Sequence, residues 1–150
     1  MKHKLGIVVG IAIGLATFVV PVSAHHSFAA EFDGSKAVRL VGKLTKVDWS
    51  NPHTYFYLDV RDDKGKTANW ACEGGGPGAL SRRGLAKGDL KLGDTIVVDG
   101  YRAKDGSNLV DARRVTLPDG RSIYGGTPGD GGPGDNGQSC PFPCLNSANG

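Results

Sequence analysis

Three histidines, His25, His26 and His53, are the residues of this sequence whose type and spacing best suit chemistry. Imidazole is the commonest protein ligand of transition metals. If a leader peptide is removed after Ala24, His25 also gains a free α-amine, so that one residue offers two nitrogen ligands to the same ion. His26 adds a second imidazole, and His53 can complete the set from the folded domain. The pattern therefore predicts a metal site at His25, His26 and His53.

Copper is the first candidate for this site because amine and imidazole nitrogens favour copper or nickel in square arrangements and zinc in tetrahedral ones. In ligand chemistry alone, the arrangement is similar to the amino-terminal histidine brace of copper proteins, which include oxidative polysaccharide-cleaving enzymes and periplasmic copper carriers. The alternative is that His25 and His26 are solvated and that His53 hydrogen-bonds a neighbouring strand or stacks with Tyr55.

No catalytic residue is predicted from the spacing. The carboxylates Glu31, Asp33, Asp59 and Glu73 are not paired for general acid and base work. The chain has no nucleophile elbow and no dinucleotide fingerprint, and the glycine run at residues 74–78 lacks the lysine of a phosphate loop. Copper is thus the one cofactor predicted. A copper-dependent oxidoreductase using the same histidines is the enzymatic alternative to a non-catalytic binding protein.

The first 24 residues are typical of a cleaved signal peptide. Lys2 and Lys4 precede an uncharged apolar stretch at residues 5–20, and small residues end at Ala24. The apolar stretch is short for a membrane span, so no stable membrane anchor is expected after cleavage, and the protein is expected in the periplasm or secreted. Without the two lysines the formal net charge falls from +3 to +1, which does not indicate a nucleic-acid partner.

The mature chain is predicted to be an all-β domain at residues 25–125, because apolar residues mostly recur with a period of two. A phase change near Gly42 indicates a bulge in the first strand. One short helix is expected between residues 74 and 85. A bent first strand and this element order are typical of a five-stranded OB-like Greek-key barrel, with a small β-sandwich as the alternative. Strands are expected at residues 38–49, 53–60, 67–73, 95–103 and 108–117.

Residues 126–150 are rich in glycine and proline and are predicted to be a disordered tail. The tail contains Cys140 and Cys144, a candidate disulfide in an oxidising compartment. Cys72 is left unpaired and is interpreted as a small buried apolar residue.

The second strand separates two kinds of side chain. Phe56, Leu58 and Val60 share one face, while His53, Tyr55 and Tyr57 share the other. Tyr55 and Tyr57 are therefore predicted to form a shallow ligand surface, and a periplasmic protein partner at this face is the third interpretation of the function. The arginine pairs at residues 82–83 and 113–114 are interpreted as solvated.

Four segments carry a resemblance to a known family: AHHSFAAEFD, VDWSNPHTYFYLDV, NWACEGGGPGALSRRG and GDTIVVDGYRAKDGSNLVDARRVTLPDG. They resemble a family of short exported proteobacterial proteins that is classed as a domain of unknown function. The resemblance covers roughly residues 25–125 and implies a periplasmic location without implying a reaction. Cys72 departs from the apolar residue expected there, and the tail lies outside the resemblance.

The cleavage site yields a direct prediction. Removal of 24 residues from the 150-residue chain leaves a mature protein of 126 residues that begins at His25. Mass spectrometry of the exported protein and sequencing of its amino terminus check this expectation. A mature chain that starts anywhere other than His25 would remove the chelating α-amine from the predicted site.

Overall fold

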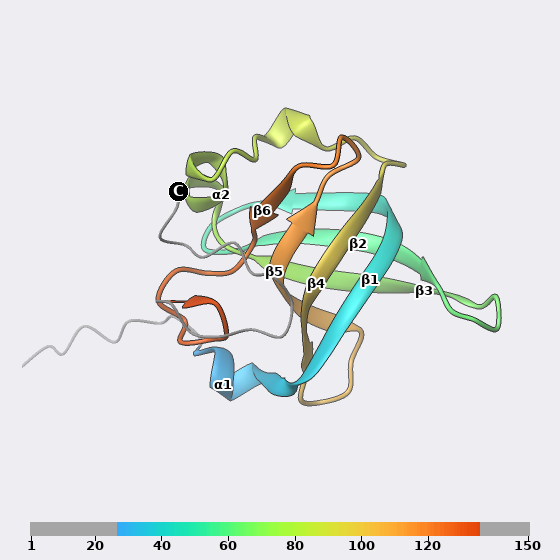
Figure 1. Ribbon diagram of the computed structural model, residues 1–150, viewed down its shortest axis with the longest axis horizontal. Coiled ribbons are helices and arrows are strands. Elements are labelled where there is room, and N and C mark those ends of the chain that lie inside the picture. The colour runs from blue at the N-terminus through green and yellow to red at the C-terminus, as the bar shows by residue number, and fades with distance from the viewer. Residues whose placement is uncertain (1–26, 136–150) are drawn as a thin grey trace, which may run out of the picture.

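The computed structural model describes residues 27–135, which form a mostly β domain with two short α-helices and one 3-10 turn (Figure 1). His25, His26, Cys140 and Cys144 lie outside the described residues. The elements in chain order are α1 (Phe28–Glu31), β1 (Phe32–Trp49), β2 (Thr54–Arg61), β3 (Thr67–Gly74), α2 (Pro77–Arg82), η1 (Lys87–Asp89), β4 (Thr95–Ala103), β5 (Leu109–Thr116) and β6 (Ser122–Tyr124). Within this range no helix has the length and apolar character needed to cross a bilayer.

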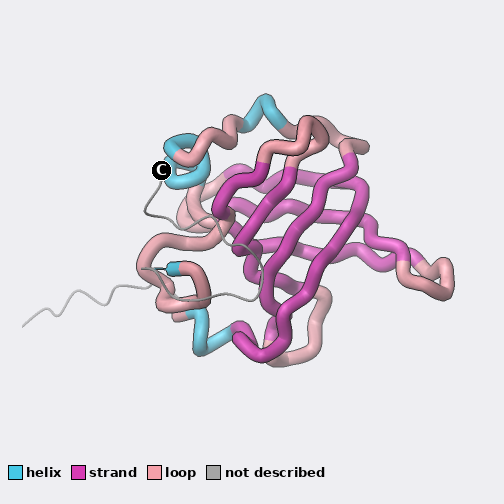
Figure 2. The backbone as a smooth tube through the Cα atoms, in the orientation of Figure 1, coloured by secondary structure: helices cyan, strands magenta, loops and turns pink. Residues whose placement is uncertain are grey.

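The strands form one sheet (Figure 2), whose order is β3-β2-β1-β4-β5-β6. Consecutive neighbours in this order pair antiparallel. The sheet also curves far enough for β3 to pair with β5, in parallel, through Ala71–Leu109, Cys72–Val110 and Glu73–Asp111. This additional pairing joins the third strand to the fifth, so that Glu73 and Asp111 lie next to each other.

The predicted bulge in β1 is confirmed. The register between β1 and β2 shifts between Leu44 and Lys46, shortly after the phase change in the sequence. Gly42 lies at the bend, where a Cβ atom would approach the carbonyl oxygen of Asp59 to 2.8 Å. The bulge lets one long strand pair with β4 through its first half and with β2 through its second half.

One hydrophobic core fills the inside of the curved sheet. The apolar face predicted for the second strand is confirmed for Phe56 and Leu58, which are fully buried together with Cys72. Trp49 and Trp70 pack against the edge of this core and are partly exposed. A smaller cluster under α1 contains Phe28, Phe32, Tyr101 and Ala103.

The structure extends the predicted elements in two places. β1 begins at Phe32 rather than Val38, because residues 33–37 pair irregularly with β4 and carry no apolar alternation that the sequence could reveal. α1 and β6 are additional elements of only a few residues each, too short to produce a periodic signal.

The segment after β6, residues 125–135, packs beside the sheet between α1 and α2 (Figure 1), and we name it the C-terminal strap. Its carbonyl at Gly125 accepts a hydrogen bond of 2.7 Å from the amide of Gly75, and the amide of Gly125 donates to the carbonyl of Arg113. Thr127, Asp130 and Asp135 are buried. The expectation of disorder from residue 126 is therefore wrong for the strap, because polar contacts to the sheet hold a segment that has little apolar surface.

A second bulge interrupts the pairing of β4 with β5. Asp99 pairs with Arg114, but the next residue, Gly100, pairs with Ala112, so Arg113 is the extra residue of β5. The Arg113 side chain is fully buried, against Asp130 of the strap and the Phe28 ring. Gly100 is required at this point because a Cβ atom would overlap the carbonyl oxygen of Asp111.

We expect Gly100→Ala to lower the free energy of unfolding by about 2–3 kcal/mol, because the added methyl group overlaps backbone that cannot move without breaking the β4–β5 pairing. Gly88→Ala is the matched control. Its added methyl group meets open space, so a change within about 0.5 kcal/mol is expected. Denaturant unfolding of the two variants makes the comparison, and equal losses of stability would contradict the role assigned to the bulge.

Candidate functional site

A hollow of about 390 Å³ lies beside the start of β2. The β1–β2 connection forms one wall, and the Asn51–Pro52 peptide in that connection is cis. Side chains from α1, β2 and β3 form the rest. The residues that line the hollow are Glu31, Ser50, Asn51, Pro52, His53, Tyr55 and Glu73.

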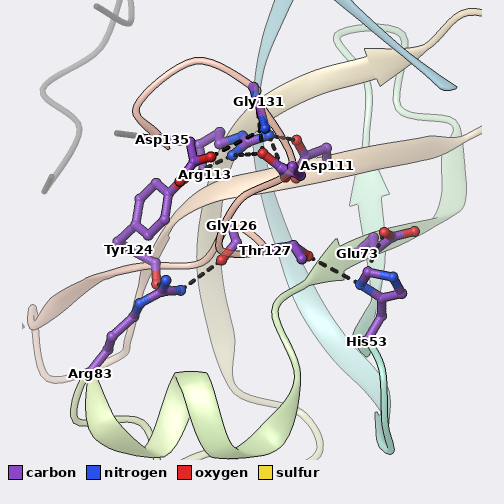
Figure 3. A network of polar contacts seen from close by, with 12 residues as sticks. His53, Glu73, Arg83, Asp111, Arg113, Tyr124, Gly126, Thr127, Gly131 and Asp135 are labelled. Atoms are coloured by element: carbon purple, nitrogen blue, oxygen red, sulfur yellow. Dashed lines mark hydrogen bonds and ion pairs between the residues drawn. The ribbon is translucent and has the colours of Figure 1, made fainter. Parts of the chain in front are cut away.

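His53 is the central side chain of this region and is 8% exposed. Its Nδ1 lies 3.1 Å from Oγ1 of Thr127 and 3.3 Å from Oε1 of Glu73 (Figure 3). Its Nε2 is buried and has no hydrogen-bond partner among the described residues. One ring nitrogen is thus held by two polar groups, and the other is left with its hydrogen-bonding capacity unused.

Glu73 is held in place from its other oxygen. The Tyr55 hydroxyl donates a hydrogen bond of 2.8 Å to Oε2 of Glu73. Burial, followed by the neighbouring Glu73 carboxylate, raises the pKa of Tyr55, so this hydroxyl remains a donor. Tyr55 and Glu73 also face each other across the β2–β3 pairing. The carboxylate is therefore fixed between a tyrosine and a histidine.

Thr127 reaches His53 from the strap, which is fastened on the opposite side by Arg83 of the turn after α2. The Arg83 guanidinium donates to the carbonyls of Gly126, at 2.6 Å, and of Tyr124, at 3.3 Å. It also lies over the Tyr124 ring, with 4.6 Å between the guanidinium carbon and the ring centroid. These contacts fix the backbone immediately before Thr127.

Deeper in the molecule, a buried arginine joins the strap to the sheet. Arg113 lies 2.5 Å from Asp111 and 2.8 Å from Asp130, and it donates to the Tyr124 hydroxyl at 2.8 Å (Figure 3). We name Asp111, Arg113 and Asp130 the arginine latch. Burial raises the pKa of Asp111 to about 7, and Arg113 opposes this shift while Asp130 adds to it. Two carboxylates facing one guanidinium leave a negative charge that burial disfavours.

The strap also holds the beginning of the described chain. The backbone amide of Phe28 donates to the carbonyl of Asp130 at 2.9 Å. The Phe28 ring lies edge-on to Tyr101, and its centroid is 4.9 Å from the Arg113 guanidinium carbon. Phe28 is buried, and Glu31 of the same helix lines the hollow. The chain segment that follows His26 is therefore fixed close to the strap and to His53.

The predicted site residues have different outcomes. His25 and His26 fall outside the described residues, as does the candidate disulfide between Cys140 and Cys144. Within residues 27–135, no group of three or more His, Cys, Asp or Glu side chains is arranged to hold a metal ion. The metal site stays a prediction.

Tyr55 and Tyr57 lie side by side with 6.4 Å between ring centroids, and the Lys46 ammonium is 5.0 Å from the Tyr57 ring centroid. Only Tyr55 lines the hollow. Both rings are half-buried, and their role as a ligand surface stays a prediction.

Cys72 is fully buried in the core and unpaired within the described range. Burial raises the pKa of its thiol to about 12, so the thiol is protonated and unreactive at neutral pH. This placement agrees with its interpretation as a small apolar residue.

The interpretation of the second arginine pair as solvated is wrong for Arg113, which is fully buried in the arginine latch. Its neighbour Arg114 forms an ion pair with Asp99 instead. Glu73 and Thr127 were also missed as site residues. Glu73 lies on the strand face opposite Cys72, and neither its burial nor the burial of Thr127 is visible in the apolar pattern.

Comparison with known proteins places the chain in a family. Residues 12–110 match the DUF6152 family, which is described as a family of unknown function, and the chain belongs to it. No curated protein matches the chain significantly. The matched range includes His25, His26, His53 and Glu73 but ends before the strap.

The arginine latch predicts a pH dependence of stability. The Asp111 carboxyl has a pKa of about 7 when folded and an ordinary value of 3.8 when exposed. Between these values the native state holds more protons than the unfolded state, so this contribution to stability falls as the pH rises from about 3.8 to about 7. Asp111→Asn removes the titration. The stability of the native protein relative to this variant should therefore increase as the pH is lowered through this window.

Denaturant unfolding of both proteins at several pH values makes the measurement. Asp119→Asn serves as the control, because Asp119 is an exposed carboxylate on a turn and its pKa is lowered rather than raised by Arg121. A stability difference for Asp111→Asn that stays constant with pH, or that reverses sign, would contradict the raised pKa.

Proposed function

We propose that the protein is a small exported binding or accessory protein that holds a transition-metal ion, with copper as the first candidate, at His53 together with His25 and His26. The observation that carries the proposal is the His53 ring, which is nine-tenths buried, oriented through Nδ1 and unpartnered at Nε2 within the described range. An unsatisfied buried nitrogen is costly unless a ligand uses its lone pair.

The surroundings of His53 support a role as a metal ligand. Ligating histidines almost always donate their second ring N–H to a carboxylate, a carbonyl or water, which fixes the ring orientation and makes the ligating nitrogen more basic. Glu73 and Thr127 are placed to do this at Nδ1. A histidine that served only to fill the core would gain nothing from leaving Nε2 without a partner.

The remaining ligands are proposed to come from the residues just before Ser27. Phe28 is fixed by its hydrogen bond to Asp130 and by its contact with Arg113, and His26 precedes Phe28 by two residues. Thr127, from the same strap, contacts His53. The strap thus contacts both Phe28 and His53, which supports the proposal that the residues before Ser27 supply the remaining ligands.

The scaffold is proposed to be an OB-like Greek-key barrel made from β1 to β5. Three features support this assignment: the bulged β1 that pairs with both β2 and β4, the helix between β3 and β4, and the parallel pairing of β3 with β5. The hollow lies beside β2 and β3, the strands that OB folds use for ligand binding.

Export through a cleaved signal peptide is part of the same proposal. The amine ligand exists only if cleavage leaves His25 at the amino terminus, and the periplasm is where such a leader sends a bacterial protein. An accessory role needs no further catalytic group, and a periplasmic protein partner can receive or supply the ion. If the bound copper cycles between oxidation states, the oxidoreductase alternative applies to the same residues.

Calorimetric titration of the mature protein with Cu²⁺ and with Zn²⁺ tests the proposal. We expect one ion to bind per chain, with Cu²⁺ bound more tightly. His53→Ala should weaken binding by about tenfold or more, which corresponds to about 1.4 kcal/mol. One additional alanine before His25 should weaken Cu²⁺ binding to a similar extent, because it moves the free amine away from the imidazole of His25.

Tyr57→Phe is the control, since Tyr57 does not line the hollow. Equal, weak binding by the native protein, the extended protein and His53→Ala would overturn the metal proposal and leave the Tyr55 and Tyr57 rings, as a protein-binding surface, as the function to test.

A further inference from the structure

The contacts at His53 also determine which ring nitrogen carries the proton. The Glu73 carboxylate is 3.3 Å from Nδ1, and an ionised carboxylate can only accept hydrogen bonds. Nδ1 must therefore donate. A neutral imidazole has one N–H, so a proton on Nδ1 leaves a lone pair on Nε2, the nitrogen that is buried without a partner among the described residues.

We infer that Glu73 and Thr127 are positioning residues that hold His53 in the Nδ1-protonated tautomer, with the Nε2 lone pair presented to a Lewis-acidic metal ion. The identity of the ion rests on the proposed function, whereas the tautomer does not. The opposite tautomer places two acceptors, Nδ1 and the Glu73 carboxylate, against each other and buries an unpaired Nε2–H.

The Glu73 carboxylate is held facing His53 because both of its oxygens have partners. Oε2 accepts from the Tyr55 hydroxyl at 2.8 Å, while Oε1 faces His53. The backbone around Glu73 is fixed as well, since Glu73 pairs with Tyr55 on one side and with Asp111 on the other. Tyr55, Glu73 and His53 thus form a chain in which the two outer groups donate to the central carboxylate.

Thr127 supplies the second support from a different part of the fold. Its hydroxyl lies 3.1 Å from Nδ1, and its position depends on the strap, which Arg83 and the arginine latch fasten. The ring is therefore oriented by the sheet through Glu73 and by the strap through Thr127. Docking of the strap and orientation of the ring favour each other.

Substitution of Glu73 by glutamine distinguishes a role of Glu73 in setting the His53 tautomer from a role in packing alone. The amide has one acceptor and one donor in place of two acceptors. The Tyr55 hydroxyl, which is already at hydrogen-bond distance, donates to the amide oxygen of the glutamine. The amide NH₂ group then faces Nδ1 of His53. Nδ1 must become an acceptor, so Glu73→Gln should convert His53 to the Nε2–H tautomer.

Removal of the competing hydroxyl should reverse this effect. In the double variant Glu73→Gln with Tyr55→Phe, the amide oxygen is free to turn toward His53 and to accept from Nδ1. Tyr55→Phe alone leaves Glu73 as an acceptor and should keep the native tautomer. A role for Glu73 in packing alone predicts no such reversal.

The experiment is long-range ¹H–¹⁵N NMR of the mature, metal-free protein, with the His53 signals identified by their absence in His53→Gln. We expect the Nδ1–H tautomer in the native protein, the Nε2–H tautomer in Glu73→Gln, and recovery of Nδ1–H in the double variant. An Nε2–H tautomer in the native protein, or no change in Glu73→Gln, would overturn the inference whether or not a metal binds.

Zn²⁺ titration of the same proteins gives the second readout. Glu73→Gln should weaken Zn²⁺ binding by about 10–100-fold, as loss of an outer-shell partner typically does. Thr127→Val should weaken binding in the same direction, and Thr127→Ser, which retains the hydroxyl, should restore it. Thr116→Val is the matched control, because it removes a hydroxyl that contacts Ser122 instead.

The two proposals fail in different ways. If the native protein binds no metal but has the expected tautomers, the metal function is wrong and the positioning role of Glu73 stands. If the native protein binds metal tightly while Glu73→Gln changes neither tautomer nor affinity, the metal function stands and the positioning role is wrong.

Discussion

The ion pairs of the buried Arg113 guanidinium are the interaction on which the position of the strap, and through it the region around His53, depends. It joins Asp111 of the sheet to Asp130 of the strap, and it contacts the Phe28 ring at the start of the domain. A buried ion pair offers little net stabilisation compared with apolar packing, but loss of one partner leaves an uncompensated buried charge. The arginine latch is therefore better understood as a device that specifies where the strap lies than as a major source of stability.

A short series of contacts connects the arginine latch to His53. Asp130 fixes the strap, Arg83 fixes the backbone at Gly126, and Thr127 then lies against Nδ1 of His53. From the other side, the pairing of β3 with both β2 and β5 places Glu73 against the same nitrogen. A histidine oriented by two independent parts of the fold has little freedom left in its ring, which is the condition for a well-defined ligand.

Much of the scaffold could be predicted from the sequence. Alternating apolar residues located β2, β3, β4 and β5 closely, and the change of phase after Gly42 indicated the bulge in β1. These features are local, because each depends on which face of a strand is buried. His53 could also be identified from the sequence, because its residue type alone suggests metal binding.

The partners of His53 were not predictable in this way. Arg113 is buried against Phe28 and the strap residue Asp130, and Glu73 meets His53 beside Thr127, which lies more than fifty positions later in the chain than Glu73. Composition favoured disorder for the strap, since glycine-rich segments lack apolar surface, but hydrogen bonds and ion pairs supply what apolar contacts do not. Polar anchoring of this kind depends on long-range geometry, which one sequence does not display.

The hydrogen bond between Phe28 and Asp130 has a consequence for the order in which the protein matures. It connects almost the first described residue with almost the last, so the polar contacts around His53 cannot all form until the residues of the strap are available. In a chain that is made from its amino terminus, the segment at Phe28 exists long before Asp130 and lacks this partner until Asp130 has been added. The region around His53 is accordingly among the last parts of the described fold to be completed.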